Sequence, residues 1–400
     1  MHPTSSRLTL IFSSLGHAYM HLLAAYFFVV VLPLEREWQI PYHELIELWT
    51  VGALLIGLAA LPAGWLSDRW SAAGMMVVFF VGLGVSAIVC GLARSPTSLW
   101  VGLCLLGTFA SIYHPVGIPW LVRTSTTSRG KALGVNGIFG SVGVAGAGIV
   151  AGALIDASGW RAAFIVPGVV SVATGVAMLL YMRAGLLTDA EEAVSADLER
   201  DGASATRAFA ILQCTMLCGS LVYHSAQVAL PKLFALRLEA LVGGSAFGIG
   251  SLIAFVYGMA ALTQVTAGHV ADRWPLKPVY ASAFLLQVPL FWLISRIGGP
   301  ALVLTAGAAL VVNTGALPAE NMLLAAATPR DRHGLVFGLK FVLAFGAAPL
   351  SIWLVSAFAD SIGGFGWIFS VLALLAAIGC LAALLLPRPV ARLAPPAAAT

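Results

Sequence analysis

The sequence predicts an all-α membrane protein with twelve transmembrane helices in two pseudo-symmetric six-helix halves. Of the 400 residues, 60% are apolar and only 10% are charged, whereas soluble domains carry about 25% charged residues. Twelve apolar runs recur along the chain, each close to the roughly 20 residues that a helix needs to cross a bilayer. Several landmarks also recur at one constant offset, as an internal duplication would produce.

The duplication is visible in the stretch Gly64-Trp-Leu-Ser-Asp68-Arg69-Trp70 and its echo Gly268-His-Val-Ala-Asp272-Arg273-Trp274. In both copies a glycine lies four residues before an Asp-Arg-Trp triplet, between one apolar run and the next. Two further glycine pairs, 130 with 334 and 134 with 338, keep the same offset of 204 residues. An offset of about half the chain predicts two homologous halves.

We expect the spans in order along the chain, with one polar interruption. Their residues are 8–32, 46–66, 73–93, 97–122, 131–154, 161–182, 208–230, 246–270, 277–295, 300–326, 334–358 and 364–386. The stretch 188–207 contains six acidic residues, which is typical of a solvated linker. The predicted domains are an N-terminal half (1–187), a cytoplasmic linker (188–207), a C-terminal half (208–386) and a disordered tail (387–400) rich in proline and alanine.

The distribution of lysine and arginine predicts the orientation in the membrane. One end of the predicted bundle holds only Arg36, Arg94, Arg161, Lys232, Arg237 and Arg296, and Lys340 lies inside a span. The other fourteen of the 21 basic residues fall on the side of the termini. Because cytoplasmic loops carry the excess of positive charge, both termini are expected in the cytoplasm.

The Gly-x-x-x-Asp-Arg pattern after a second membrane helix resembles the loop between spans two and three of the major facilitator superfamily. Chain length, helix count and duplication agree with that family over the full length. The resemblance implies the major facilitator fold in a bacterial inner (plasma) membrane. Spans one, four, seven and ten would line a central cavity, spans two, five, eight and eleven would flank it, and spans three, six, nine and twelve would face lipid. The resemblance also implies that the two loops latch the halves together, a role that falls to Gly64, Asp68, Arg69, Gly268, Asp272 and Arg273.

Polar residues within the spans gather in the helices that the resemblance places around the cavity, where costly intramembrane groups are expected. The candidate substrate or proton residues are His17, His21, Tyr113, His114, Asn136, Tyr223, His224, Gln227, Glu320, Asn321 and Lys340. At i and i+4, His17 and His21 share one helix face, and the proline after His114 predicts a kink. Glu320 and Lys340 are expected at similar depth, on the order of 12–15 Å, on adjacent helices, where an ion pair would offset the burial of both charges.

The motif His-Pro-x-Gly at 114–117 also resembles bacterial facilitators of the fosmidomycin-resistance type, which are drug exporters. The sequence has no Walker-type nucleotide loop, so an ion gradient, most simply of protons, is expected to drive transport, and histidines can take part in that coupling. With four histidines, Lys340 and Arg123 against one buried carboxylate, Glu320, the cavity favours a small organic anion or an amphiphilic drug-like molecule. We therefore expect a secondary active transporter that works by alternating access. The resemblance of residues 114–117 to drug exporters favours the export direction.

Three alternatives stay open: an organic-anion uptake permease, a non-transporting receptor or scaffold, and a transition-metal transporter. Imidazole suits zinc, iron and nickel, but no cysteine or carboxylate pair accompanies His17, His21, His114 and His224, so we assign no metal ligands. Without a nucleophile–base motif, an enzyme is not expected. The net charge of +4 is scattered rather than clustered, which argues against nucleic acid. We expect a monomer without a cofactor, whose partners are a small-molecule substrate, protons and the lipid bilayer.

Overall fold

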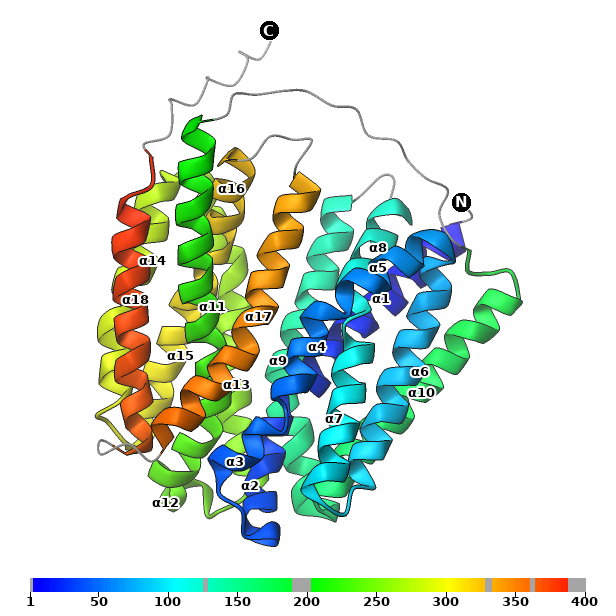
Figure 1. The fold of residues 1–400 in the computed structure, drawn as a ribbon, viewed down its shortest axis with the longest axis horizontal. Coiled ribbons are helices and arrows are strands. Elements are labelled where there is room, and N and C mark those ends of the chain that lie inside the picture. Colours follow the sequence, from blue (N-terminus) through cyan, green and yellow to red (C-terminus); the bar gives the residue numbers. More distant parts are fainter. Residues whose placement is uncertain (1–2, 125–128, 189–202, 328–332, 360–363, 388–400) are drawn as a thin grey trace, which may run out of the picture.

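The computed structural model describes residues 3–124, 129–188, 203–327, 333–359 and 364–387. These ranges contain helices and no strand, and twelve helical segments among them are long and apolar enough to cross a membrane. The predicted fold class is therefore confirmed. Figure 1 shows the helices gathered into two bundles, with the early part of the chain on the right and the late part on the left.

The elements of each half follow the chain in order. The first six spans comprise α1 (Pro3–Ala25), α2 (Phe27–Trp38), α3 (Tyr42–Glu47), α4 (Thr50–Leu58), α5 (Ala60–Arg69), α6 (Ala72–Gly91), α7 (Pro96–Ala110), the π-helical turn η1 (Tyr113–Gly117), α8 (Ile118–Thr124), α9 (Arg129–Ser158) and α10 (Trp160–Arg183). The last six comprise α11 (Ala203–Arg237), α13 (Ala246–Arg273), α14 (Leu276–Ile294), α15 (Gly299–Gly315), α16 (Leu317–Ala327), α17 (His333–Ala359), η3 (Phe365–Trp367) and α18 (Ile368–Leu384), with the short α12 (Glu239–Val242) between two of them.

Spans four and ten are interrupted at equivalent positions of the duplication. Span four widens into η1 directly after Ile112, and span ten breaks between α15 and α16 at Ala316, which is 204 residues later. A proline follows each break, Pro115 and Pro318. Proline has no N–H to donate and its ring crowds the preceding turn, which accounts for both interruptions.

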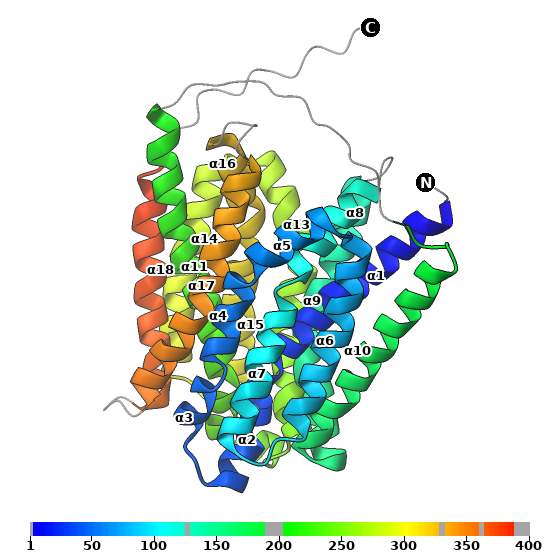
Figure 2. The ribbon, with the colours of Figure 1, turned by 45° about the vertical axis from the view of Figure 1, so that its right-hand side comes forward.

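The two halves meet along α9 with α13 and along α4 with α17. Glycine permits the first of these contacts, because a side chain on Gly148 would collide with the backbone of Gly250, and the reverse holds as well. Small residues let membrane helices approach this closely. Figure 2 shows the same seam turned by 45°.

Polar contacts between the halves gather at the end of the bundle opposite the termini. Lys232 of α11 lies 2.5 Å from Glu35 of α2, and the Tyr42 hydroxyl donates to the Val228 carbonyl at 2.7 Å. Asp156, at the end of α9, accepts hydrogen bonds from the backbone N–H groups of Ala246 and Phe247 at 3.1 and 3.0 Å, and so caps the start of α13. These bonds hold the two bundles together at that end.

Several predicted span boundaries differ from the structure by a few residues, and one of these differences falls in the predicted linker. Helix α11 begins at Ala203, inside the predicted linker 188–207, because alanine-rich sequence extends a membrane helix into water at little cost. Most of the linker (189–202) and the tail after residue 387 lie outside the described residues. The division into domains thus stays a prediction.

Candidate functional site

A buried ion pair joins α16 to α17 in the C-terminal half. Lys340 Nζ lies 2.7 Å from Glu320 Oε1, and their side chains are only 12% and 7% exposed. Lys340 also donates to the Asn321 side-chain oxygen at 2.5 Å. The expected pairing of the two charges is thus present, on two helices that are consecutive spans.

Glu320 has a second partner that the sequence analysis missed. The Tyr280 hydroxyl on α14 lies 2.9 Å from Glu320 Oε2 and 2.9 Å from Thr215 Oγ1 on α11. Tyr280 is fully buried, whereas its span, the ninth, was expected to face lipid. That expectation is wrong for one face of α14, since Phe284 and Gln287 are buried as well. The three positions follow i, i+4 and i+7, which is the signature of a single buried stripe.

The ion pair borders a cavity of about 200 Å³ within the C-terminal half. Its walls combine amides, aromatic rings and the charged pair, and they include Tyr223, His224, Gln264, Phe284, Gln287, Asn313, Glu320 and Lys340. Asn313 donates to the Gln287 side-chain oxygen at 2.9 Å across spans ten and nine. A mostly apolar cavity with a few convergent polar groups is the usual form of a small-molecule site.

The N-terminal half holds a neutral polar cluster at the equivalent position. Asn136 of α9 lies 204 residues before Lys340. Its side-chain amide donates to the Ser13 hydroxyl at 3.1 Å and lies within hydrogen-bond distance of the Tyr113 hydroxyl. His17 stacks on the Tyr113 ring, with centroids 4.9 Å apart. The cluster ties α1, η1 and α9 together.

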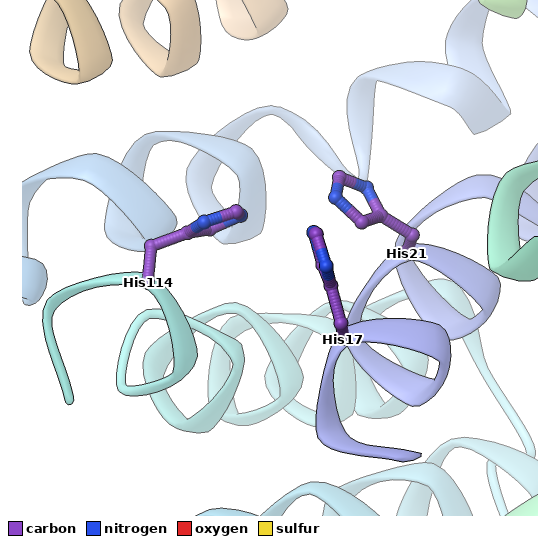
Figure 3. Close-up of side chains that lie close together, drawn as sticks. All are labelled: His17, His21 and His114. Carbon is purple, nitrogen blue, oxygen red and sulfur yellow. The ribbon is translucent and has the colours of Figure 1, made fainter. Parts of the chain in front are cut away.

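Three of the four candidate intramembrane histidines meet beside this cluster. His17 and His21 project from one face of α1, and His114 projects from η1 toward them (Figure 3). Their ring centroids lie 5.0 Å (17 to 21), 5.5 Å (17 to 114) and 5.6 Å (21 to 114) apart. All three are half-buried.

A second, smaller cavity of about 70 Å³ lies between the halves. Its lining includes His21 from α1, Trp49 from the turn before α4, and Tyr223, His224 and Gln227 from α11. His224 borders both cavities. The candidate residues therefore form two groups, one in each half, with the cavity between the halves adjoining both.

The two Asp-Arg loops end α5 and α13 at the same end of the bundle as the termini. Asp68 lies 3.8 Å from Arg123 of α8, and Arg69 stacks over the Trp65 ring at 4.2 Å. Gly64 faces Pro115 of η1, whereas a side chain on Gly268 would meet open space. All three partners of the first loop, Arg123, Trp65 and Pro115, belong to the N-terminal half, so this loop is tied to its own bundle in this structure.

The sequence model of the Major Facilitator Superfamily matches residues 15–260. The chain belongs to the major facilitator superfamily. It is therefore a multi-pass membrane transporter and not an enzyme. The narrower resemblance to the fosmidomycin-resistance type stays a prediction.

Several curated relatives within the superfamily carry antibiotic names. A tetracenomycin C resistance and export protein from Streptomyces glaucescens is 26% identical over 246 residues, which cover 60% of this chain and 40% of that protein. A probable actinorhodin transporter from Streptomyces coelicolor is 28% identical over 181 residues, or 42% of this chain and 30% of that one. A puromycin resistance protein from Streptomyces alboniger is 31% identical over 131 residues, or 32% and 24%. The chain spans 40% or less of the length of these relatives.

A solved structure supports the same fold. The bacterial homologue of the human lysosomal transporter Spinster, in an inward-facing and unoccupied conformation, superposes with a TM-score of 0.76. The match covers 96% of this chain and 98% of that one at 15% sequence identity. At such low identity the likeness concerns the fold alone.

Proposed function

We propose that this transporter is a proton-coupled exporter that moves an amphiphilic drug-like molecule by alternating access. The observation that carries the proposal is the Glu320–Lys340 pair, buried and bordering a cavity of about 200 Å³. A charge left unpaired inside a membrane protein is costly. Each member of the pair therefore needs a replacement partner whenever the pair opens, and a proton or a cargo group can supply it.

Whether the cargo binds Glu320 or Lys340 decides whether cargo and proton move in opposite directions or in the same direction. A cargo whose cationic or hydrogen-bonding group binds the Glu320 carboxylate competes with a proton, and this competition couples outward cargo to inward protons. An organic anion would bind Lys340 once Glu320 is protonated, which moves cargo and proton in the same direction and gives uptake. Because the named relatives include resistance and export proteins, export is the first candidate, and uptake of an organic anion is the second.

Alternating access fits the division of contacts along the seam between the halves. The bonds of Glu35, Asp156 and Lys232 join the halves at the end opposite the termini. If both termini are cytoplasmic, this is an inward-facing arrangement. In the outward-facing arrangement these bonds would break, and the two Asp-Arg loops would hold the halves together at the end nearer the termini.

The cargo we expect is an aromatic molecule with several hydrogen-bonding groups. Tyr223 and Phe284 contribute aromatic rings to the wall of the cavity, and Gln264, Gln287 and Asn313 contribute amides. The molecules named for the relatives, tetracenomycin C, actinorhodin and puromycin, are the first compounds to try.

The test uses inside-out vesicles whose interior is acidified by respiration. We expect tetracenomycin C to accumulate in vesicles that contain the protein, and the accumulation to stop when an ionophore collapses the pH gradient. Glu320→Gln alone and Lys340→Met alone should each abolish it, with membrane levels checked by immunoblotting. The double variant should insert normally and stay uncoupled. If the double variant recovers full gradient-dependent transport, the pair is structural and the coupling role is wrong.

A further inference from the structure

The strongest unassigned feature of the molecule is the meeting of His17, His21 and His114. Each offers one ring nitrogen, and these three nitrogens lie within 4.8 Å of one another. Ligands of one tetrahedral zinc ion are about 3.3 Å apart, given Zn–N bonds of about 2.0–2.1 Å. Small side-chain rotations would close the difference. The i, i+4 spacing of His17 and His21 is also the spacing by which one helix presents two histidines to a zinc ion.

A second observation concerns the ring of His17. Its Nδ1 lies 2.8 Å from the backbone carbonyl oxygen of Asn136, and a carbonyl can only accept. Nδ1 therefore carries the hydrogen, and Nε2 of the neutral ring keeps its lone pair. Histidines that ligate metals almost always donate their other ring N–H to a carbonyl or carboxylate in this way.

The backbone around the cluster leaves room for this arrangement. A methyl group on Gly140 of α9 would lie 2.5 Å from His17 Cε1 and 2.6 Å from Nε2, so only glycine allows the ring to sit there. His114 is delivered by the π-helical turn η1, and such turns are frequent at functional sites. His21 also lines the cavity between the halves, which gives the cluster an open side.

We propose that His17, His21 and His114 form a binding site for a divalent transition-metal ion of the zinc class, with one coordination position open to the cavity between the halves. The three ligands are neutral imidazoles, and the cluster includes no carboxylate among the residues that the structure describes. The ion's double positive charge must therefore be balanced by an anion that enters from the cavity. A carboxylate or phenolate oxygen, such as an acidic aromatic cargo carries, is suited to that position.

The site can be tested without any transport, so its failure and the failure of the proposed export are separate results. The full chain, purified in detergent with a tag free of histidine, is titrated with Co²⁺, whose visible absorption reports imidazole coordination, and with Zn²⁺ by equilibrium dialysis. We expect one equivalent to bind. His21→Gln and His114→Gln should each weaken binding by about 100-fold or more, and Gly140→Ala, which displaces the His17 ring, by roughly tenfold.

The control is His269→Gln, which removes an exposed histidine of α13 that belongs neither to the cluster nor to the residues that line the two cavities. Its affinity for Co²⁺ should stay within about twofold of the parent protein, and thermal unfolding of every variant should confirm folding. Acetate or salicylate should tighten Co²⁺ binding and change the visible spectrum if an anion completes the site. The proposal is overturned if the parent protein takes up no stoichiometric metal, or if His269→Gln loses affinity as severely as His21→Gln and His114→Gln do.

Discussion

Asn136 and Lys340 occupy equivalent positions in the two halves, 204 residues apart, yet they hold different chemistry. The amide of Asn136 closes a neutral network with Ser13 and Tyr113, which needs no counter-charge. Lys340 pairs with Glu320 in the C-terminal half. Within the described part of the chain, the buried pair that a proton can open thus lies in the C-terminal half, and we expect coupling to be confined to that half.

The hydroxyl of Tyr280 is expected to hold the Glu320 carboxylate in place beside Lys340. A hydrogen bond to a charged group contributes about 1.5–3 kcal/mol. Tyr280→Phe should therefore lower the melting temperature of the purified protein and slow gradient-driven transport, while the protein still reaches the membrane. Differential scanning fluorimetry and the vesicle assay measure the two effects.

Tyr257→Phe is the matched control for this change. Tyr257 is also buried, on α13, and its hydroxyl has no hydrogen-bond partner within the described part of the chain. Removing a hydroxyl that makes no bond should leave the melting temperature unchanged or raise it slightly. Equal losses in the two variants would mean that Tyr280 acts only by filling space.

The charged pair could be predicted from the sequence, but its surroundings could not. Depth arithmetic at 1.5 Å per residue places Glu320 and Lys340 level with each other. Tyr280 was missed because a whole span was assigned to lipid, although a helix buries one stripe and exposes another. The sequence groups His114 with His17, His21 and His224, but it could not single out the three that meet, because their meeting depends on how η1 packs against α1.

At the scale of elements, α9 shows which glycines of a patterned helix are required. Seven of its glycines lie between positions 134 and 152, and small residues at such spacing permit close packing of membrane helices without showing which of them the packing needs. In the structure, side chains on Gly140, Gly143, Gly148 and Gly152 would collide with neighbours, whereas those on Gly134, Gly137 and Gly146 would meet open space. The required glycines face α1 or α13. The positions of these neighbouring helices, and not the spacing of the glycines, therefore decide which glycines are required.

Gly148→Ala should disturb the crossing of α9 and α13. The added methyl group would collide with the Gly250 carbonyl, so the seam seen here should weaken and the opposite conformation should become more populated. We expect faster labelling, in intact cells, of a single cysteine placed at Ala24, which lines the cavity between the halves, by an impermeant thiol reagent. Gly146→Ala, two residues away in open space, should change nothing. Equal labelling in both variants would contradict a role for this crossing.

For the whole molecule, the number of helices and their division into two halves could be predicted from the sequence. The thickness of the hydrocarbon layer sets the length of each span, and the duplication sets the number of halves, so twelve helices in two bundles follow from the sequence. Which end of the bundle is closed does not follow from the sequence. Two conformations of such a transporter share most of their packed core, and a few contacts between helix ends decide between them.

Orientation in the membrane provides a test that does not depend on the cargo. The basic residues predict that the linker and the tail face the cytoplasm. Single cysteines at Ala190 and Ala398, in an otherwise cysteine-free protein, should resist an impermeant thiol reagent in intact cells and react after lysis. Both positions lie outside the described residues, so the assay tests topology alone. Rapid labelling in intact cells would reverse the assignment.

The ion pair across the seam should control which conformation the molecule adopts. Glu35 and Lys232 lie on different halves, 2.5 Å apart, and are 26% and 19% exposed. Glu35→Lys places two like charges there, while the exchange Glu35→Lys with Lys232→Glu restores the attraction. Spin labels at Trp70 and Trp274, which are exposed at the ends of α5 and α13, report the separation of the halves at the end nearer the termini.

We expect Glu35→Lys to move the population toward a shorter distance between the labels, because breaking the seam at one end lets the other end close. A charge-assisted bond of about 1.5–3 kcal/mol corresponds to a change of roughly tenfold or more in the ratio of the two states. The exchanged pair should return the distribution to that of the parent protein. Arg161→Gln is the control, since it breaks an ion pair of 3.1 Å with Glu37 inside one half and should leave the distance unchanged. If Arg161→Gln shifts the distribution as far as Glu35→Lys does, the effect comes from surface charge and the seam does not select the state.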